Sequence, residues 1–210
     1  MEAFYWSFQL PGRLFVRLGV APDTLTWTSL WLSACAAPAA ALGHFSTAGL
    51  FVLVGSAFDS FDGLVARERK IASDYGEMLD AVIDRYADMA PLVGLVIFYR
   101  FSVEQMLVPF LTLVGSVMLS YVRAKAESLK LDLPGGLMRR HERITYVVVA
   151  LVVGPELSHW LGSPFGVVHP ATLTLLALVA LISNVAAMRL TLNARRALAQ
   201  AGRGPLGGQS

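Results

Sequence analysis

Six long apolar runs decide what this chain can fold into. A helix of about 20 consecutive apolar residues spans the roughly 30 Å hydrocarbon core of a bilayer, so each run is predicted to be a transmembrane helix. The expected spans are about 24–42, 47–66, 74–99, 104–127, 144–161 and 170–192. With 210 residues that are 55% hydrophobic and a mean hydropathy of +0.58, the chain is too apolar for an ordinary soluble domain. The sequence therefore predicts an all-α integral membrane protein with six transmembrane helices.

The segments outside these runs indicate how the chain is organised. Residues 2–18 mix aromatic side chains with Arg13 and Arg17 around a Pro-Gly pair, which is typical of an interfacial helix lying on the membrane and interrupted at the proline. Asp23 or Thr24 is expected to be the N-cap of the first span. The predicted parts are an N-terminal interfacial amphipathic helix over 1–20, a six-helix membrane domain over 21–200, and a Gly-rich disordered tail over 201–210.

The basic residues indicate the orientation. Six spans place both chain ends on one side of the membrane. Of the 17 Lys and Arg, only Arg100 clearly falls at the other side. Because cytoplasmic segments are enriched in Lys and Arg, the basic side is predicted to be cytoplasmic. The expected location is the cytoplasmic (inner) membrane.

Four carboxylates stand beside the second and third apolar runs, where charge is expensive and usually functional. At about 100° per residue, Asp59 and Asp62 share one face of a helix end. Asp80 and Asp84 share one face of the next helix in the same way. Four acidic groups without four basic partners would repel one another, so divalent cations are the expected neutralisers. All-oxygen ligands favour Mg²⁺, Mn²⁺ or Ca²⁺ over zinc, which predicts metal-dependent chemistry on a phosphate-containing substrate.

The spacing of this segment resembles a family signature, D-x2-D-G-x2-A-R-x8-G-x3-D-x3-D, of the CDP-alcohol phosphotransferase (phosphatidyltransferase) family. The fixed positions all match, at Asp59, Asp62, Gly63, Ala66, Arg67, Gly76, Asp80 and Asp84. The resemblance implies an enzyme of phospholipid biosynthesis that transfers a phosphatidyl group from CDP-diacylglycerol, or a similar CDP-linked lipid, to an alcohol and releases CMP. It also implies a homodimer in the lipid bilayer, and no nucleic-acid partner is expected.

The resemblance further implies roles for the aspartates. Asp59, Asp62 and Asp80 would ligate metal. Asp84 would touch the second ion and act as the catalytic base that takes a proton from the acceptor hydroxyl. The cofactor implied is a pair of Mg²⁺ ions, with Mn²⁺ as a substitute, that clamp the diphosphate and stabilise charge on the leaving CMP.

The remaining signature residues are predicted to bind the CDP-lipid together with Asp62. Gly63 and Ala66 lack bulk, so a nucleotide could lie close to the helix backbone, and Gly76 is interpreted in the same way. Arg67 is placed to meet a phosphate as a rigid fork. Close helix packing is the alternative for the small residues, and a simple anchor at the end of a span is the alternative for Arg67.

A second basic region predicts where the acceptor binds. Its residues lie at span ends on the side of the aspartates, and they are Arg123, Lys125, Arg140, Arg143 and Arg189. A cationic pocket suits an acceptor that itself carries phosphate. The alternative is a solvated collar of cytoplasmic charge. The string S-Y-x2-A-K-A-E, which contains Lys125, resembles the phosphatidylinositol phosphate synthases, although Arg139 stands where an acidic residue is expected.

Inositol phosphate is therefore the expected acceptor, followed by glycerol 3-phosphate, as in a phosphatidylglycerol phosphate synthase, and then by serine or a neutral alcohol. Two other classes of protein stay open. A membrane prenyltransferase also uses aspartates and Mg²⁺ on a diphosphate but lacks the G-x2-A-R element. A divalent-cation transporter would need carboxylates at mid-membrane. A purely structural reading makes the aspartates an ion-pair network with Arg67, Arg85 and Arg123.

Overall fold

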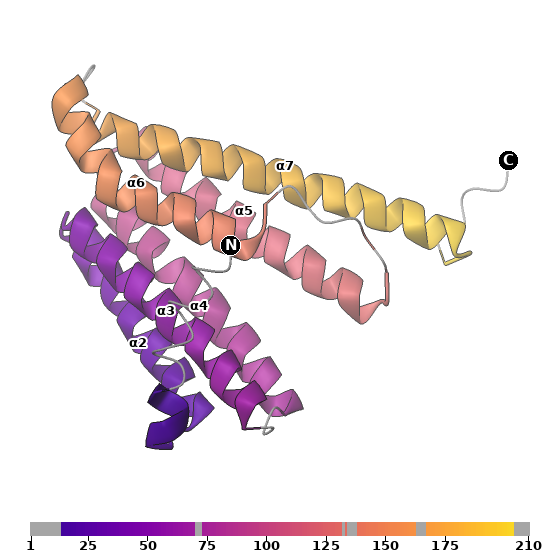
Figure 1. The fold of residues 1–210 in the computed structure, drawn as a ribbon. Coiled ribbons are helices and arrows are strands. Elements are labelled where there is room, and N and C mark those ends of the chain that lie inside the picture. Colours follow the sequence, from indigo (N-terminus) through magenta and orange to yellow (C-terminus); the bar gives the residue numbers. More distant parts are fainter. Residues whose placement is uncertain (1–13, 70–72, 132, 134–137, 163–166, 204–210) are drawn as a thin grey trace, which may run out of the picture. The chain divides into compact units, whose positions relative to one another are not determined.

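The computed structural model describes residues 14–69, 73–131, 133, 138–162 and 167–203. In this described part of the chain all regular structure is helical and there is no strand (Figure 1). The chain divides into two compact units, Met1–Phe98 and Tyr99–Ser210. The prediction of an all-α fold is thus confirmed.

The first unit contains three helices that follow a short helical segment at residues 14–18. They are α2 (Pro22–Ala41), α3 (Phe45–Glu68) and α4 (Asp74–Phe98), coloured indigo to magenta in Figure 1. α2 packs against both α3 and α4. The connection between α2 and α3 turns at Gly43, whose φ of +83° lies in the left-handed region that favours glycine.

The start of α2 differs from the prediction. Neither Asp23 nor Thr24 is the N-cap; Ala21 holds that position with an extended backbone and no side-chain capping bond. Pro22 follows in the first turn, where its fixed φ suits a helix and its missing N–H is not needed. The proline therefore starts the helix earlier than the capping pattern predicted. Asp23 lies inside the first turn, where the helix dipole favours a carboxylate.

Small residues let α2 lie close to its neighbours. A methyl group on Gly94 of α4 would collide with the carbonyl oxygen of Ala37 and lie 2.8 Å from the Cβ of Ala40. On α3, a methyl group at Gly55 would lie 3.1 Å from the carbonyl oxygen of Ser29. Membrane helices commonly associate through such close backbone approach.

Gly94→Ala is therefore expected to destabilise the first unit. The added methyl group forces α2 away from α4, and overpacking of this kind costs about 1–3 kcal/mol. The measurement is the thermal unfolding midpoint of the protein purified in detergent. Val93→Ala, at the exposed neighbouring position, is the matched control and should unfold close to the wild type. An unchanged midpoint in Gly94→Ala would contradict the close approach of the two helices.

The second unit also contains three helices. They are α5 (Val103–Ser128), α6 (Arg140–Leu161) and α7 (Pro170–Gln200), and α7 packs against both of the others. Polar side chains link α7 to α5: Thr112 Oγ1 donates to the carbonyl oxygen of Leu176 (3.1 Å). Asn184 Nδ2 likewise donates to the carbonyl oxygen of Leu111 (3.0 Å). Such side-chain bonds stabilise helix pairs where no water is present to compete.

Four of the described helices, α3, α5, α6 and α7, are long and apolar enough to cross a membrane. The protein is accordingly an α-helical membrane protein. α2 and α4 are not among these four: α2 begins with a Thr- and Ser-rich stretch, and α4 carries five acidic residues between Asp74 and Asp88. The count of six spans and the amphipathic character of the N-terminal helix stay predictions. Residues 1–13 and 204–210 lie outside the described residues.

Candidate metal centre

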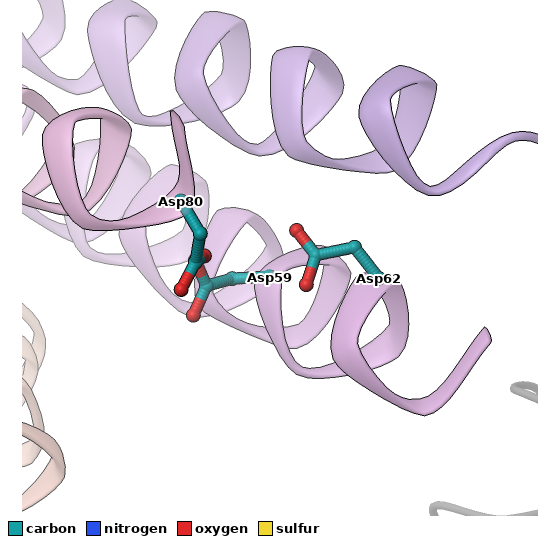
Figure 2. Close-up of side chains that lie close together, drawn as sticks. All are labelled: Asp59, Asp62 and Asp80. Atoms are coloured by element: carbon teal, nitrogen blue, oxygen red, sulfur yellow. The ribbon is translucent and has the colours of Figure 1, made fainter. Parts of the chain in front are cut away.

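Three carboxylates from two helices of the first unit lie together. Asp59 and Asp62 come from α3 and Asp80 comes from α4, and one oxygen from each lies within 4.8 Å of the others. Figure 2 shows the three side chains directed toward one another. Asp59 and Asp62 share a face because they are three positions apart on a helix. Asp62 is buried, with 6% of its surface exposed, whereas the other two are half-buried.

This donor set fits a hard divalent cation. Carboxylate oxygens are the ligands that Mg²⁺ and Mn²⁺ prefer, and three anionic groups at this spacing repel one another without a cation. The carboxylates also come from the end of α3 and the start of α4, where an ion can be reached from outside the apolar part of the helices. The sequence prediction that these aspartates converge is confirmed for Asp59, Asp62 and Asp80.

Asp84 follows Asp80 by one turn on α4 and is half-buried. Among the described residues, the group with oxygens within 4.8 Å of one another consists of Asp59, Asp62 and Asp80 and does not include Asp84. Its place on the same helix face follows from the i, i+4 spacing. Its role as a fourth ligand and as a base stays a prediction.

A threonine that sequence reasoning missed holds one of these carboxylates. Thr26 Oγ1 of α2 donates a hydrogen bond of 2.6 Å to Asp62 Oδ2, and Thr26 is 5% exposed. The same hydroxyl lies 3.1 Å from the carbonyl oxygen of Pro22. A short bond from a buried hydroxyl to a carboxylate fixes the orientation of Asp62. No local signal links two residues that are 36 positions apart.

A cavity of about 610 Å³ opens beside the carboxylates, within the range of small-molecule sites. Among the signature residues, it is lined by Asp62, Gly63, Ala66, Arg67, Gly76 and Asp80. The structure thus brings together all five residues predicted to bind the CDP-lipid. Sequence reasoning missed the other lining residues, which come from the start of α2 and the start of α4: Ala21, Pro22, Asp23, Thr26, Ser73, Asp74 and Glu77.

The surroundings of Gly63 and Gly76 differ from those of a close contact between helices. The three atoms nearest to a methyl group built at Gly63 all belong to the guanidinium of Arg67 on the same helix, the closest at 3.4 Å. At Gly76 the nearest atom is the hydroxyl oxygen of Ser73, at 3.3 Å. Neither glycine is pressed against the backbone of another helix in the way that Gly94 is. Their lack of side chains instead leaves room in the cavity, beside Arg67 in the case of Gly63.

The residues predicted to bind the acceptor phosphate all belong to the second unit. Arg123 and Lys125 lie near the end of α5, Arg140 and Arg143 lie in the first turn of α6, and Arg189 lies on α7. Hydrogen bonds join the last part of α5 to the start of α6, so the four cations of these two helices lie at one end of the unit. Lys125 and Arg189 are exposed.

Arg123 and Arg143 also hold neighbouring parts of the second unit together. Arg143 is 3% exposed, and its Nη2 donates to Ser120 Oγ at 3.1 Å, which joins α6 to α5. Arg123 Nη2 donates to the carbonyl oxygen of Met138 at 3.4 Å. Both arginines therefore help to hold the end of α5 against the chain that leads into α6.

Arg139, where the family comparison expected an acidic residue, is the N-cap of α6. Its backbone N–H donates to Glu142 Oε2 at 2.9 Å, as in one half of a capping box. The carboxylate that caps the start of this helix therefore belongs to Glu142, and the Arg139 side chain is exposed. The departure leaves the start of α6 intact.

Fold and site together define an α-helical membrane protein with a carboxylate centre suited to a divalent cation beside a cavity for a small ligand. The chain belongs to the CDP-alcohol phosphatidyltransferase family, whose sequence profile matches residues 19–185. The family is one of transferase enzymes, and the resemblance drawn from the signature is confirmed.

Similar proteins include several enzymes of inositol lipid synthesis. A phosphatidylinositol phosphate synthase of Mycobacteroides abscessus is 35% identical over 141 residues, which cover 65% of this chain and 64% of that relative. An archaetidylinositol phosphate synthase of Pyrococcus horikoshii is 34% identical over 66% of this chain and 73% of its own length. The chain thus spans just under two thirds of the first relative and about three quarters of the second.

Solved structures of the Mycobacterium tuberculosis phosphatidylinositol phosphate synthase are similar in fold. The crystal structure with CDP-DAG bound has 28% sequence identity and a TM-score of 0.75, and the match covers 89% of this chain and 92% of that one. A second crystal structure of that enzyme, in complex with manganese and citrate, gives a TM-score of 0.76 over 89% of this chain and 88% of the other.

Proposed function

We propose that this protein transfers the phosphatidyl group of CDP-diacylglycerol, or of a similar CDP-linked lipid, to inositol phosphate. The observation that carries the proposal is the position of the three-carboxylate centre at the edge of a cavity lined by Gly63, Ala66, Arg67 and Gly76. Family membership and the names of the similar enzymes support it. In the reaction, a hydroxyl oxygen of the acceptor bonds to the lipid-side phosphorus. The bond from that phosphorus to the bridging oxygen breaks, and CMP leaves with the electron pair.

We assign the metal ligands of this reaction to the aspartates. Asp59, Asp62 and Asp80 would hold Mg²⁺, or Mn²⁺ in its place, and Asp84 would complete a site for two ions. Bound ions of this kind neutralise a diphosphate and stabilise the charge on the leaving group. Support comes from the oxygen-only donor set and from the manganese complex of the M. tuberculosis enzyme. Thr26 would keep the carboxylate of Asp62 oriented toward the metal ion and the CDP-lipid.

The residues of the cavity would bind the CDP part of the lipid. Gly63 and Ala66 leave space along α3, and the guanidinium of Arg67, which lies beside Gly63, is suited to a phosphate oxygen. Asp84 would accept the proton of the attacking hydroxyl, because an alcohol is a poor nucleophile until a base removes its proton. The acyl chains would stay in the bilayer.

The acceptor's phosphate would be bound by Arg123, Lys125, Arg140, Arg143 and Arg189. Inositol phosphate is favoured over glycerol 3-phosphate because of the names of the similar enzymes, since cations alone would accept either phosphate. We further propose six membrane crossings in the cytoplasmic (inner) membrane, with the aspartates facing the cytoplasm, and a homodimer as in the family. The basic residues at the ends of α3 and α5 and at the start of α6 support this orientation.

The proposed function is tested with purified protein, CDP-diacylglycerol, Mg²⁺ and one acceptor at a time. Inositol phosphate should give CMP and one new phospholipid, whereas free inositol and serine should give neither. CMP release with glycerol 3-phosphate and with no other acceptor would support the family reaction but show that the acceptor is glycerol 3-phosphate. Lack of CMP release with every acceptor would overturn the proposed function.

Arg189→Ala is expected to raise the KM for inositol phosphate by about ten- to a hundredfold, the effect of losing one hydrogen bond between charged groups. The KM for CDP-diacylglycerol should stay near the wild-type value. Arg189 is the suitable position because it is exposed on α7, whereas the buried Arg143 also holds two helices together. Arg195→Ala removes an exposed arginine from the same helix and is the matched control. Equal acceptor KM values in both variants would mean that these cations form only a solvated collar.

A further inference from the structure

An arginine at a variable position of the family signature joins the N-terminal segment to the end of α3. Arg69, the C-cap of α3, donates from Nη2 to the carbonyl oxygen of Val16 at 2.8 Å and from Nη1 to that of Val20 at 3.1 Å. Its side chain is half-buried. One planar guanidinium thus binds two carbonyl groups that lie more than 45 positions earlier in the chain.

These carbonyl groups belong to a well-defined helix end. The short helix at 14–18 stops at Gly19, whose φ of +76° is left-handed. The N–H of Val20 donates to the carbonyl oxygen of Phe15 (3.2 Å), and the N–H of Gly19 donates to that of Val16 (3.3 Å). This pattern is a Schellman motif. Arg69 adds a cation to the negative end of the helix, where a cation is favoured.

An aromatic contact fixes the same segment to the middle of the signature. The ring of Phe15 lies 5.8 Å from the ring of Phe58 and 5.6 Å from that of Phe61, measured between centroids. These phenylalanines directly precede Asp59 and Asp62 in the chain. Together with the buried Leu25 of α2 and Val65 of α3 they form one apolar cluster. The N-terminal segment therefore packs on the helix that supplies two of the three clustered carboxylates.

The two anchors lie next to two parts of the cavity lining, at the start of α2 and near the end of α3. Residues 21–23, which directly follow the anchored Val20, line the cavity at the start of α2. Arg67, the last residue but one of α3, also lines the cavity and stands two positions before Arg69. Displacement of the segment at 16–20 from Arg69 would shift the start of α2 relative to Arg67. The arrangement of these lining residues thus depends on the connection.

We propose that Arg69 is a positioning residue, which fixes the start of α2 relative to Arg67 in the cavity that would take the nucleotide of the CDP-lipid. The inference rests on the proposed function, which makes this cavity the CDP site. Arg17 is the comparison: it lies on the N-terminal segment that Arg69 binds, but its own side chain is exposed. Both add the same charge to the basic side of the protein, so a comparison of the two separates position from charge.

Arg69→Gln is expected to raise the KM for CDP-diacylglycerol by about tenfold, with a smaller effect on kcat and none on the KM for the acceptor. Arg69→Lys should behave similarly, because one ammonium group cannot reproduce the planar fork that binds two carbonyl groups. Phe15→Ala, which removes the aromatic contact to α3, should also raise the KM for CDP-diacylglycerol. Arg17→Gln should leave both KM values near those of the wild type.

Equilibrium binding of CMP in the presence of Mg²⁺ gives a second measurement that does not need turnover. Arg69→Gln should weaken CMP binding by about the same factor as it raises the KM. Unchanged KM and CMP affinity, with only a smaller folded fraction, would show that Arg69 is a scaffold residue and overturn the proposal. If Arg17→Gln changed the KM for CDP-diacylglycerol and the CMP affinity as much as Arg69→Gln does, the cause would be surface charge, and the proposal would be overturned as well. Wild-type protein that binds CMP but transfers no phosphatidyl group would refute the proposed function. The role of Arg69 would then be decided by the CMP affinity of Arg69→Gln alone.

Discussion

Asp80→Asn is expected to abolish turnover. Asp80 is the contribution of α4 to the carboxylate centre, and its oxygen lies within 4.8 Å of those of Asp59 and Asp62. An amide keeps the shape but loses the negative charge and one acceptor oxygen, so it cannot replace a carboxylate that binds a divalent cation. The residual rate should fall below detection in the assay of CMP release. Mn²⁺ affinity, measured on the same preparation, should fall with it.

The matched control is Glu68→Gln, the same chemical change at an exposed position near the end of α3. This variant should keep nearly the full rate. In the wild type, an excess of EDTA should stop the reaction and added Mg²⁺ or Mn²⁺ should restore it. Full activity in the chelator, or a largely active Asp80→Asn variant, would contradict metal-dependent catalysis at this centre.

Asp84→Asn is expected to separate binding from chemistry. In the proposed reaction Asp84 takes the proton of the acceptor hydroxyl, and a general base contributes on the order of 10²–10⁴ in rate. The kcat should therefore fall by that factor, while the affinity for CMP and Mg²⁺ changes much less. The loss should be smaller at higher pH, because hydroxide in the solvent partly replaces the missing base.

Asp88→Asn provides the comparison, since it removes the same charge from the same helix one turn further along. It should retain far more activity than Asp84→Asn. A collapse of CMP affinity in Asp84→Asn that matches the loss of turnover would show that Asp84 serves chiefly as a metal ligand. The separate assignment as a base would then be wrong.

The part of the site that could be predicted is the part with regular spacing. Asp59 and Asp62 are three positions apart on one helix, so their shared face follows from helix geometry alone. The short connection between α3 and α4 brings the end of one helix near the start of the next, which places Asp80 beside them. The cavity residues of the signature follow from the same two helix ends.

The remaining parts depend on contacts between distant segments that leave no periodic pattern. The bond from Thr26 to Asp62 joins two helices, and the bonds from Arg69 reach back to the N-terminal segment. The N-cap of α2 was predicted wrongly because the fixed φ of Pro22 outweighs the capping preference of Asp23. α7 also runs to Gln200, beyond the predicted span, since its last residues are good helix formers although they are polar.

The division of the chain between Phe98 and Tyr99 separates the two proposed binding functions. The carboxylates and the whole lining of the cavity belong to the first unit, whereas the five basic residues proposed for the acceptor belong to the second. On the proposed assignment, substitutions that alter the choice of headgroup would fall outside the helices whose packing shapes the carboxylate centre. A lineage could then diversify its lipids by mutation of one half of the gene and inherit the chemistry of the other half unchanged.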